Sequence, residues 1–285
     1  MLDNTHTPER LRNEHFLNMP SPFRIFQHEI DHPIPTHWHE FFELAFVVSG
    51  EGKHVMNGIT QPIRRGSCFL LTPADFHAII PTRGQTIQLY DVIFLEQFIR
   101  EQVIDLLFEG RTQYVHTFNI GEADLIEQEY IRLWEESENP QKGGELIRQG
   151  GLERILIDLA RKCPTLSASI SKYPMEQDNN QMNPLIRKAL LYIHHHFREP
   201  LTLRETAEVC GLSANYFSEC FRKYTGFTFQ SYVLNQRLLF AKALLQTTKL
   251  PVTEICYASG FNTIAHFERA FKKSFDLCPR DVRKG

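Results

Sequence analysis

The spacing of hydrophobic and polar positions changes part-way along the chain. From Phe23 to about Leu95, short apolar runs alternate with turn signals such as Asn57-Gly58 and Arg65-Gly66, a pattern typical of strands. Asn57-Gly58 predicts a hairpin, because both residues tolerate a positive φ. Short strands with regular turns predict a small barrel or sandwich.

Helical spacing follows the strands. Residues 122–138 and 145–162 carry apolar side chains three and four positions apart, and Asn139-Pro140 and Gly143-Gly144 separate the two segments, which predicts a helix pair. This pair either forms a dimer surface or covers the core of the barrel. Residues 164–183 are polar without a period and predict a linker, after which nearly every residue is helical in pattern.

The last hundred residues repeat themselves. Residues 217–223 match residues 267–273 after a shift of 50, which predicts two copies of one structural unit. Each copy predicts a helix-turn-helix, over 202–224 and over 252–275, with a glycine at the turn. The predicted helix between them, 228–247, would span about 30 Å. Because one turn of DNA measures about 34 Å, this helix could set two recognition helices into successive major grooves.

The distribution of charge separates the two halves. The net charge is −3, but residues 184–285 hold 15 Lys and Arg against 8 Asp and Glu, whereas the remaining residues hold 16 against 26. A basic domain attached to an acidic one predicts a polyanion as the partner of the basic domain.

Length and composition limit the class of protein. A chain of 285 residues, 42% hydrophobic and 23% charged, is typical of a globular protein with about two domains. We predict domains over 1–163 and 184–285. No apolar run approaches the roughly 18–20 residues of a membrane span, and the start does not resemble a signal peptide, so we expect a cytoplasmic protein without a membrane partner. Six cysteines without C-x-x-C spacing favour reduced, packed thiols.

The densest group of chemically active residues lies near residue 40. A period of two puts His37 and His39 on one face of a strand, Glu43 can keep that face, and His77 on a later strand can join them inside a barrel. Three histidines and a carboxylate would suit Zn, Ni, Mn or Fe(II). The alternative is that these side chains line a pocket or satisfy buried hydrogen bonds. Trp38 would suit stacking on a sugar ring or a place in the core.

The C-terminal hundred residues resemble the AraC/XylS family of transcription regulators. The resemblance is carried by Leu201-Thr202-Leu203, Gly211-Leu212-Ser213, Phe221-Arg222-Lys223, Arg237-Leu238, Gly260-Phe261 and Arg269-Ala270-Phe271. It implies that DNA bases are read by Asn215, Ser218 and Glu219 in the first copy and by Ile264, Ala265, Glu268 and Arg269 in the second. Side-chain chemistry agrees: Asn suits adenine, Glu suits cytosine, Arg suits guanine, and apolar groups suit the thymine methyl. We expect Arg222, Lys223, Lys272 and Lys273 to contact phosphates.

The N-terminal half resembles a cupin. His37, His39, Glu43 and Gly50 fit the pattern His-x-His-x3-Glu-x6-Gly, and Gly66, Pro73 and His77 fit part of a second cupin motif. Together the resemblances imply an α+β protein, with a cupin-like β-barrel and helix pair followed by an all-α DNA-binding domain. In such sensor domains the pocket often takes a sugar or another small molecule without a metal. We therefore expect no required cofactor, with a divalent metal as the alternative occupant.

These observations predict a sequence-specific DNA-binding transcription regulator and not an enzyme, with no catalytic residues. By resemblance, it is a homodimeric activator that responds to a small metabolite such as a sugar and contacts RNA polymerase. One alternative is a metal-dependent cupin enzyme, an isomerase or dioxygenase, fused to a DNA-binding domain. Another is a constitutive DNA-binding module whose first domain only dimerises.

Overall fold

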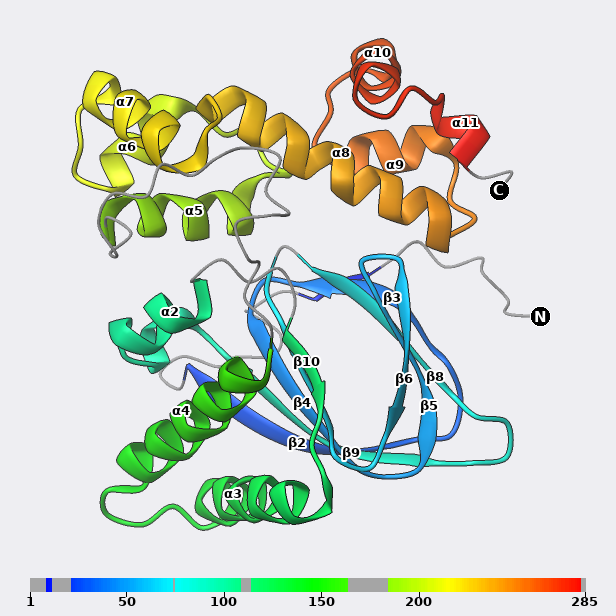
Figure 1. Cartoon of the computed structure of the whole chain (residues 1–285), viewed down its shortest axis with the longest axis vertical. Helices are drawn as coiled ribbons and strands as arrows, with labels where there is room; N and C mark the ends of the chain where they lie inside the picture. Colours follow the sequence, from blue (N-terminus) through cyan, green and yellow to red (C-terminus); the bar gives the residue numbers. More distant parts are fainter. Residues whose placement is uncertain (1–8, 12–21, 74, 109–113, 164–183, 283–285) are drawn as a thin grey trace. The chain divides into compact units, whose positions relative to one another are not determined.

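The chain forms two compact units. The computed structural model describes residues 9–11, 22–73, 75–108, 114–163 and 184–282, so the N-terminal unit is described within 9–163 and the C-terminal unit within 184–282. The first unit is built mainly of strands and the second of helices (Figure 1), which confirms the predicted α+β class. The predicted linker, 164–183, lies outside the described residues.

Two five-stranded sheets make up the barrel of the N-terminal unit. One sheet, called the β3 sheet here, has the order β1-β3-β8-β5-β6, and the other, called the β4 sheet, has the order β10-β7-β4-β9-β2. The strands are β1 (Glu9–Leu11), β2 (Phe23–Ile30), β3 (Ile34–His39), β4 (Phe42–Ser49), β5 (Glu51–Met56), β6 (Ile59–Arg64), β7 (Ser67–Leu71), β8 (Phe76–Pro81), β9 (Ile87–Phe94) and β10 (Tyr114–Thr117).

The predicted hairpin at Asn57-Gly58 is present between β5 and β6. Both residues have a positive φ, 50° and 83°, the backbone that a two-residue turn of this kind requires. Between the two sheets lies an apolar core cluster, to which side chains from both sheets contribute: Ile30, Ala45, Val47, Met56, Ile63, Phe69, Leu71, Ile79, Ile87 and Leu89.

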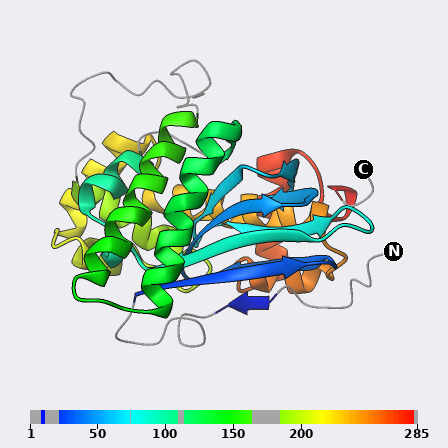
Figure 2. The same ribbon diagram turned by 90° about the horizontal axis from the view of Figure 1, so that it is seen from below.

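Helices cover the outer face of the β4 sheet. The helices are α2 (Glu101–Phe108), α3 (Ile120–Glu138) and α4 (Gly144–Lys162), with a short 3-10 helix at Glu96–Phe98. Tyr130 of α3 is fully buried, donates a hydrogen bond to the Leu44 carbonyl over 3.3 Å, and stacks on Phe46. Helix α4 lies beside α3 (Figures 1 and 2). Arg154 of α4 donates hydrogen bonds to both carboxylate oxygens of Glu129 of α3, over 2.9 and 2.7 Å. The helix pair therefore covers the barrel, as one of the two alternatives predicted.

Seven helices are described in the C-terminal unit. They are α5 (Pro184–His196), α6 (Leu203–Val209), α7 (Ala214–Thr225), α8 (Phe229–Thr247), α9 (Val252–Ala258), α10 (Ile264–Phe275) and α11 (Pro279–Val282). Helices α6 and α7 form the first predicted helix-turn-helix and α9 and α10 the second, and α8 corresponds to the predicted connecting helix.

The two helix-turn-helix copies match at their turns. Gly211 and Gly260 both have a positive φ, 68° and 82°. In each copy the glycine N–H and the next N–H bond back to carbonyls three and five residues earlier, which is the Schellman ending of a helix. The glycines are 49 residues apart although the copies are shifted by 50, because Asn262 adds one residue before the second N-cap.

Each recognition helix buries one aromatic face. Phe217 and Phe221 of α7, and Phe267 and Phe271 of α10, have no exposed surface, in agreement with their spacing of four residues. Phe221 meets Tyr232 of α8 edge to face, and Lys242 of α8 lies over the Phe275 ring. Helix α8 is thus the common support against which both recognition helices pack.

Two further expectations concern the cysteines and membranes. All six cysteines have free thiols, and four of them are buried, as expected for cysteines that act as small hydrophobic side chains. Within the part of the chain that the structure describes, no helix has the length and apolar character that crossing a bilayer requires.

Candidate functional site

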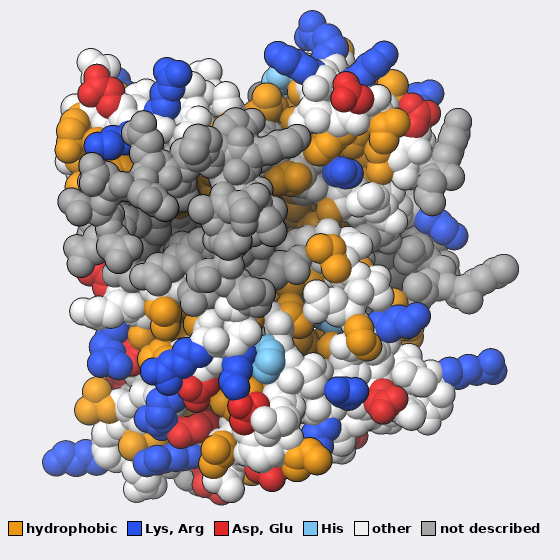
Figure 3. Space-filling view, in the orientation of Figure 1, with side chains coloured by type: hydrophobic (Ala, Val, Ile, Leu, Met, Phe, Trp, Pro, Cys, Tyr) orange, Lys and Arg blue, Asp and Glu red, His pale blue; other side chains and the backbone are white. Residues whose placement is uncertain are grey.

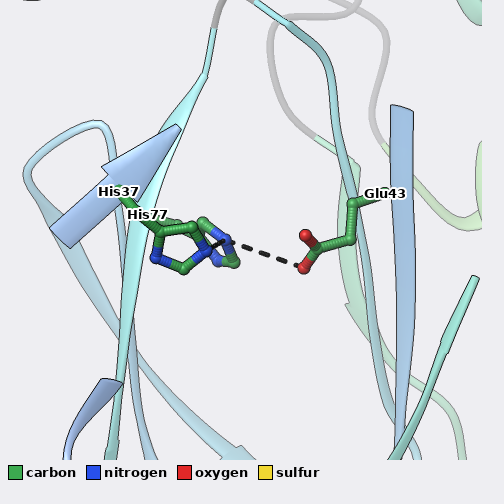
Figure 4. Close-up of side chains that lie close together, drawn as sticks. All are labelled: His37, Glu43 and His77. Carbon is green, nitrogen blue, oxygen red and sulfur yellow. Dashed lines mark hydrogen bonds and ion pairs between the residues drawn. The ribbon is translucent and has the colours of Figure 1, made fainter. Parts of the chain in front are cut away.

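Three predicted site residues meet inside the barrel. His37 of β3 and His77 of β8 lie side by side, and Glu43 of β4 faces them from the opposite sheet (Figure 4). The Nε2 atoms of His37 and His77 are 2.9 Å apart, and Nε2 of His77 is 3.6 Å from Oε1 of Glu43. The three potential ligand atoms all lie within 4.8 Å of one another. The arrangement joins the two sheets of the barrel through polar side chains.

Glu43 lies on a different strand, and in a different sheet, from the one predicted. His37 and His77 are direct partners in the antiparallel pair β3·β8, so His77 joins His37 from a later strand, as the sequence predicted. Strand β3, however, ends at His39, and β4 begins at Phe42 in the other sheet. The expectation that Glu43 keeps the face of the His37 strand was therefore wrong, and Glu43 reaches the histidines across the barrel.

The other two predicted residues of this region have different places. His39 is fully buried, and its Nε2 lies 3.3 Å from Oε2 of Glu43, whereas His77 lies near Oε1 of the same carboxyl. Trp38 is also buried, but the alternation of a strand directs it to the opposite face from His37 and His39. The close set is thus His37, Glu43 and His77, with His39 beside it.

Sequence reasoning missed His54. This residue of β5 is buried, and its Nε2 lies 3.2 Å from Nδ1 of His77. His54 is part of neither the first nor the second cupin motif. The sequence pattern still marks it, because His54 and Met56 alternate with more exposed neighbours along β5, as inward-facing residues of a strand do.

Burial dominates the electrostatics of the cluster. It raises the pKa of the Glu43 carboxyl well above its usual range, and the charge of Asp91 adds to that shift. Burial also lowers the pKa of His77 well below its usual value, with smaller contributions from His37, His54 and His39, and it lowers the pKa of His54 to about 3. The interior therefore disfavours charged side chains that no counter-charge compensates.

Backbone carbonyls set which ring nitrogens can act as ligands. Nδ1 of His37 lies 3.0 Å from the Pro35 carbonyl, and Nδ1 of His39 lies 2.7 Å from the Phe41 carbonyl. A carbonyl oxygen only accepts, so in the neutral rings both Nδ1 atoms donate and both Nε2 atoms carry lone pairs. Those lone pairs lie close to the Glu43 carboxyl, a donor set of imidazole nitrogens and oxygen that fits a divalent transition metal.

His37 and His77 offer two imidazole nitrogens and Glu43 offers a carboxylate oxygen, all within 4.8 Å of one another. These are ligand types that zinc and similar divalent ions take in proteins. The residues present therefore fit a divalent metal. The ion would act as a Lewis acid or as a link between the two sheets.

The predicted base-reading residues lie on the open faces of the two recognition helices. Asn215, Ser218 and Glu219 are exposed on α7. On α10, Ala265, Glu268 and Arg269 are exposed and Ile264 is half-buried. Arg269 donates from Nε to the Ala265 carbonyl over 3.2 Å, so its side chain lies along the helix and has to turn outward to reach a base.

The predicted phosphate contacts lie at the ends of the same helices. Arg222 and Lys223 occupy the last turn of α7, Lys272 and Lys273 the last turn of α10, and all four are exposed. Lys and Arg side chains gather over α10 at the top right of the space-filling view (Figure 3). This basic surface suits the backbone of a nucleic acid.

Comparison with known proteins covers both units. Residues 20–156 match the family model of the AraC-like ligand binding domain, and residues 206–285 match that of a helix-turn-helix domain. The chain is 26% identical over 257 residues to the HTH-type transcriptional activator RhaS of Enterobacter sp. (strain 638), and 27% identical over 257 residues to that of Escherichia coli (strain SE11). Each alignment covers 88% of this chain and 88% of the relative.

A solved structure also shows similarity. The C-terminal domain of AraT, a response regulator from Geobacillus stearothermophilus, is 33% identical; the match covers 37% of this chain and 88% of that chain, with a TM-score of 0.36. The assignment of family rests on the two family models, which agree with the barrel and with the paired helix-turn-helix units. The chain belongs to the AraC/XylS family of DNA-binding transcription regulators, with a domain for a small-molecule ligand in front of the DNA-binding domain.

Proposed function

We propose that this protein activates transcription from a specific operator when a small-molecule effector, such as a sugar, binds its barrel. The observation that carries the proposal is the pair of helix-turn-helix units, each with an exposed polar and basic recognition helix, on the common support α8. The relatives are named transcriptional activators, which supports activation. Because such a regulator acts on chromosomal DNA, we propose a cytoplasmic location.

The length of α8 supports a two-groove mode of binding. Its 19 residues span about 28 Å at 1.5 Å per residue, near the roughly 34 Å that separates successive major grooves on one face of DNA. In this proposal Asn215, Ser218 and Glu219 read bases in one groove, and the α10 set of Ile264, Ala265, Glu268 and Arg269 reads bases in the next. The four basic residues at the helix ends hold the phosphates.

Arg269→Ala and Lys272→Ala are expected to weaken DNA binding in different ways. Loss of Arg269 should cost about 1–3 kcal/mol on the preferred operator and relax one base position, because Arg can bridge two acceptors of guanine. Loss of Lys272 should weaken binding to all sequences and lower the slope of log affinity against log salt by about one. Fluorescence anisotropy on an operator selected from random DNA, over a series of salt concentrations, measures both.

The matched control is Lys249→Ala, which removes an exposed lysine between α8 and α9, away from the recognition helices. It should leave affinity and salt slope close to those of the parent protein. A uniform loss on all sequences in Arg269→Ala would remove Arg269 from the base contacts, and an unchanged slope would remove Lys272 from the phosphate contacts.

We propose that the active form is a homodimer that pairs through α3 and α4 and recruits RNA polymerase. These helices bury one face on the barrel and leave large apolar side chains outward: Leu125 of α3 is 66% exposed and Leu146 of α4 is 73% exposed. Exposed apolar groups of this size support a contact with a second copy. Sedimentation of the full chain, compared with Leu125→Glu, tests the dimer.

For the barrel, we propose that the effector site centres on His37, His39, Glu43 and His77, and that the nitrogen and oxygen ligands of this cluster also suit a divalent transition metal beside the effector. Trp38, on the other face of β3, has weaker support as a pocket residue. The same cluster would serve the alternative function, a cupin enzyme fused to a DNA-binding domain. Turnover of a substrate by the metal-loaded chain would favour that alternative over the regulator.

Divalent metal is expected to stabilise the N-terminal unit of the chelator-stripped chain. A ligand present at about 100 times its Kd raises the free energy of unfolding by about 2.7 kcal/mol, and here the ion would link both sheets. Trp38 and Trp134 are the two tryptophans of the chain, so thermal unfolding followed by tryptophan fluorescence reports on this unit. Mn²⁺, Co²⁺, Ni²⁺ and Zn²⁺ should be tested beside a panel of monosaccharides.

The outcomes separate the occupants. A shift with metal that His77→Ala removes supports the metal, and a shift with a sugar in the stripped chain supports a metal-free effector pocket. If neither metal nor sugar changes the unfolding, while the chain still binds its operator, the constitutive module is the better description.

A further inference from the structure

We propose that His54 positions His77 as a metal ligand, by accepting the Nδ1 hydrogen of His77 so that the Nε2 lone pair faces the ion. This inference rests on the metal-binding role proposed above for His37, Glu43 and His77. His54 itself would not touch the ion.

The contact between the two rings is specific. Nε2 of His54 lies 3.2 Å from Nδ1 of His77, and the ring planes are 84° apart. Each residue is only 1% exposed, so bulk water competes little for this hydrogen bond. The ring of His77 therefore has one nitrogen toward His54 and the other toward His37 and Glu43.

A neutral imidazole carries one ring hydrogen, and this limits the arrangements. Nε2 of His37 is an acceptor because Nδ1 of that ring faces the Pro35 carbonyl. Without an ion, His77 can donate from Nε2 to His37 over 2.9 Å. With an ion, Nε2 must carry a lone pair, so the hydrogen of His77 has to reside on Nδ1, where His54 is the group that accepts it. Metal-binding histidines commonly have such an orienting partner on the second nitrogen.

The surroundings of His54 fix the position of its ring. Its ring stacks on Phe69 of β7, with centroids 4.0 Å apart, and Phe69 belongs to the apolar core cluster. Its direct partner across β5·β8 is Ile79, also a member of that cluster. A ring held between apolar groups cannot turn to solvent, so Nε2 of His54 stays directed at Nδ1 of His77. In the metal-free arrangement this nitrogen donates to His77, and with an ion bound His54 carries its hydrogen on Nδ1 and accepts at Nε2.

Two substitutions distinguish positioning from packing. His54→Phe keeps a ring on Phe69 but removes the acceptor, whereas His54→Gln keeps an acceptor of similar reach. Ni²⁺ titration of the chelator-stripped full chain by calorimetry should show a 10–100-fold weaker Kd for His54→Phe and a value within a few-fold of the parent for His54→Gln. The absorption spectrum of the Co²⁺-loaded chain should change in His54→Phe and be largely restored in His54→Gln. His32→Gln, at an exposed loop histidine, is the control and should change neither.

The results that overturn the proposal are equally specific. Parent-like affinity and spectrum in His54→Phe would exclude a positioning role, and equal losses in both variants would indicate packing alone. If the parent chain binds its operator but no metal, the metal role and this inference fall together, whereas metal binding that is indifferent to His54 overturns only the inference. Should His54→Phe not fold, nitrogen NMR of the Zn²⁺-loaded parent decides, since a His77 without a hydrogen on Nδ1 contradicts the proposal.

Discussion

Gly260→Ala is expected to destabilise the C-terminal unit by about 3–4 kcal/mol, far more than Gly211→Ala. Gly260 has a φ of 82°, and a Cβ placed there would lie 2.6 Å from the Arg198 carbonyl oxygen and 2.8 Å from the Arg198 Cα. A residue with a side chain in this backbone region costs about 1–2 kcal/mol, and a collision with backbone adds about 1–3 kcal/mol. The turn of the second helix-turn-helix would have to move away from the segment that follows α5.

Gly211 is the matched control within the same chain. It occupies the equivalent turn with a φ of 68°, but a Cβ placed there meets no atom of the described residues within 4 Å. Gly211→Ala should therefore cost only the backbone term, about 1–2 kcal/mol. Both substitutions remove the same freedom from the unfolded chain, so the difference between them isolates the contact with Arg198.

Hydrogen–deuterium exchange of peptides from α9 and α10 measures the effect, and tryptophan fluorescence checks that the N-terminal unit is unchanged. We expect Gly260→Ala to lose contacts in the second groove while the first helix-turn-helix still binds. Equal losses of stability in the two variants would contradict the role assigned to the Arg198 contact.

The helical half was predictable because its signals are local. The N-caps Ser213 and Thr263 and the turn glycines stand at the positions where the helices begin and end. The turn glycines of the two copies are offset by one residue because Asn262 is inserted in the second turn. Hydrogen bonds between residues three to five apart decide such features, and the sequence displays them directly.

The clustering of His37, Glu43 and His77 in the barrel was predictable, but the way in which the strands bring these side chains together was not. The run from His37 to Val48 contains neither Gly nor Pro, so nothing local marks the change of sheet between β3 and β4. The chain bends at Glu40, whose N–H bonds to the Leu11 carbonyl, a partner far away in sequence. Pairings of this kind depend on the whole sheet, which is why Glu43 was expected on the wrong face.

His54 shows a second limit of sequence reasoning. Alternation along β5 marks it as inward-facing, but only the pairing of β5 with β8 brings it near His77. A spacing motif records residues that touch a ligand, whereas an orienting residue can come from any neighbouring strand. The structure was needed to find it.

Acidification from pH 7 to pH 4 is expected to remove about 3 kcal/mol of stability from the C-terminal unit through His194 alone. His194 belongs to α5. Its Nε2 atom is 3.0 Å from the hydroxyl oxygen of Tyr232 of α8, and the two rings are parallel. Burial lowers the pKa of His194 to about 4 from an ordinary value of 6.5. Between these two values the unfolded chain binds a proton that the folded chain does not, so stability falls as pH falls.

His194→Gln isolates the effect, because glutamine can still hydrogen-bond Tyr232 but does not titrate. Relative to His194→Gln, the parent chain should lose about 2 kcal/mol of its free energy of unfolding between pH 7 and pH 5, and about 3 kcal/mol between pH 7 and pH 4. Chemical denaturation followed by the helical circular dichroism signal measures it, with His196→Gln as the control that retains the pH dependence. A difference that stays constant from pH 7 to pH 4 would mean that His194 takes up its proton in the folded chain as readily as in the unfolded one. Burial between α5 and α8 would then not be holding the ring neutral.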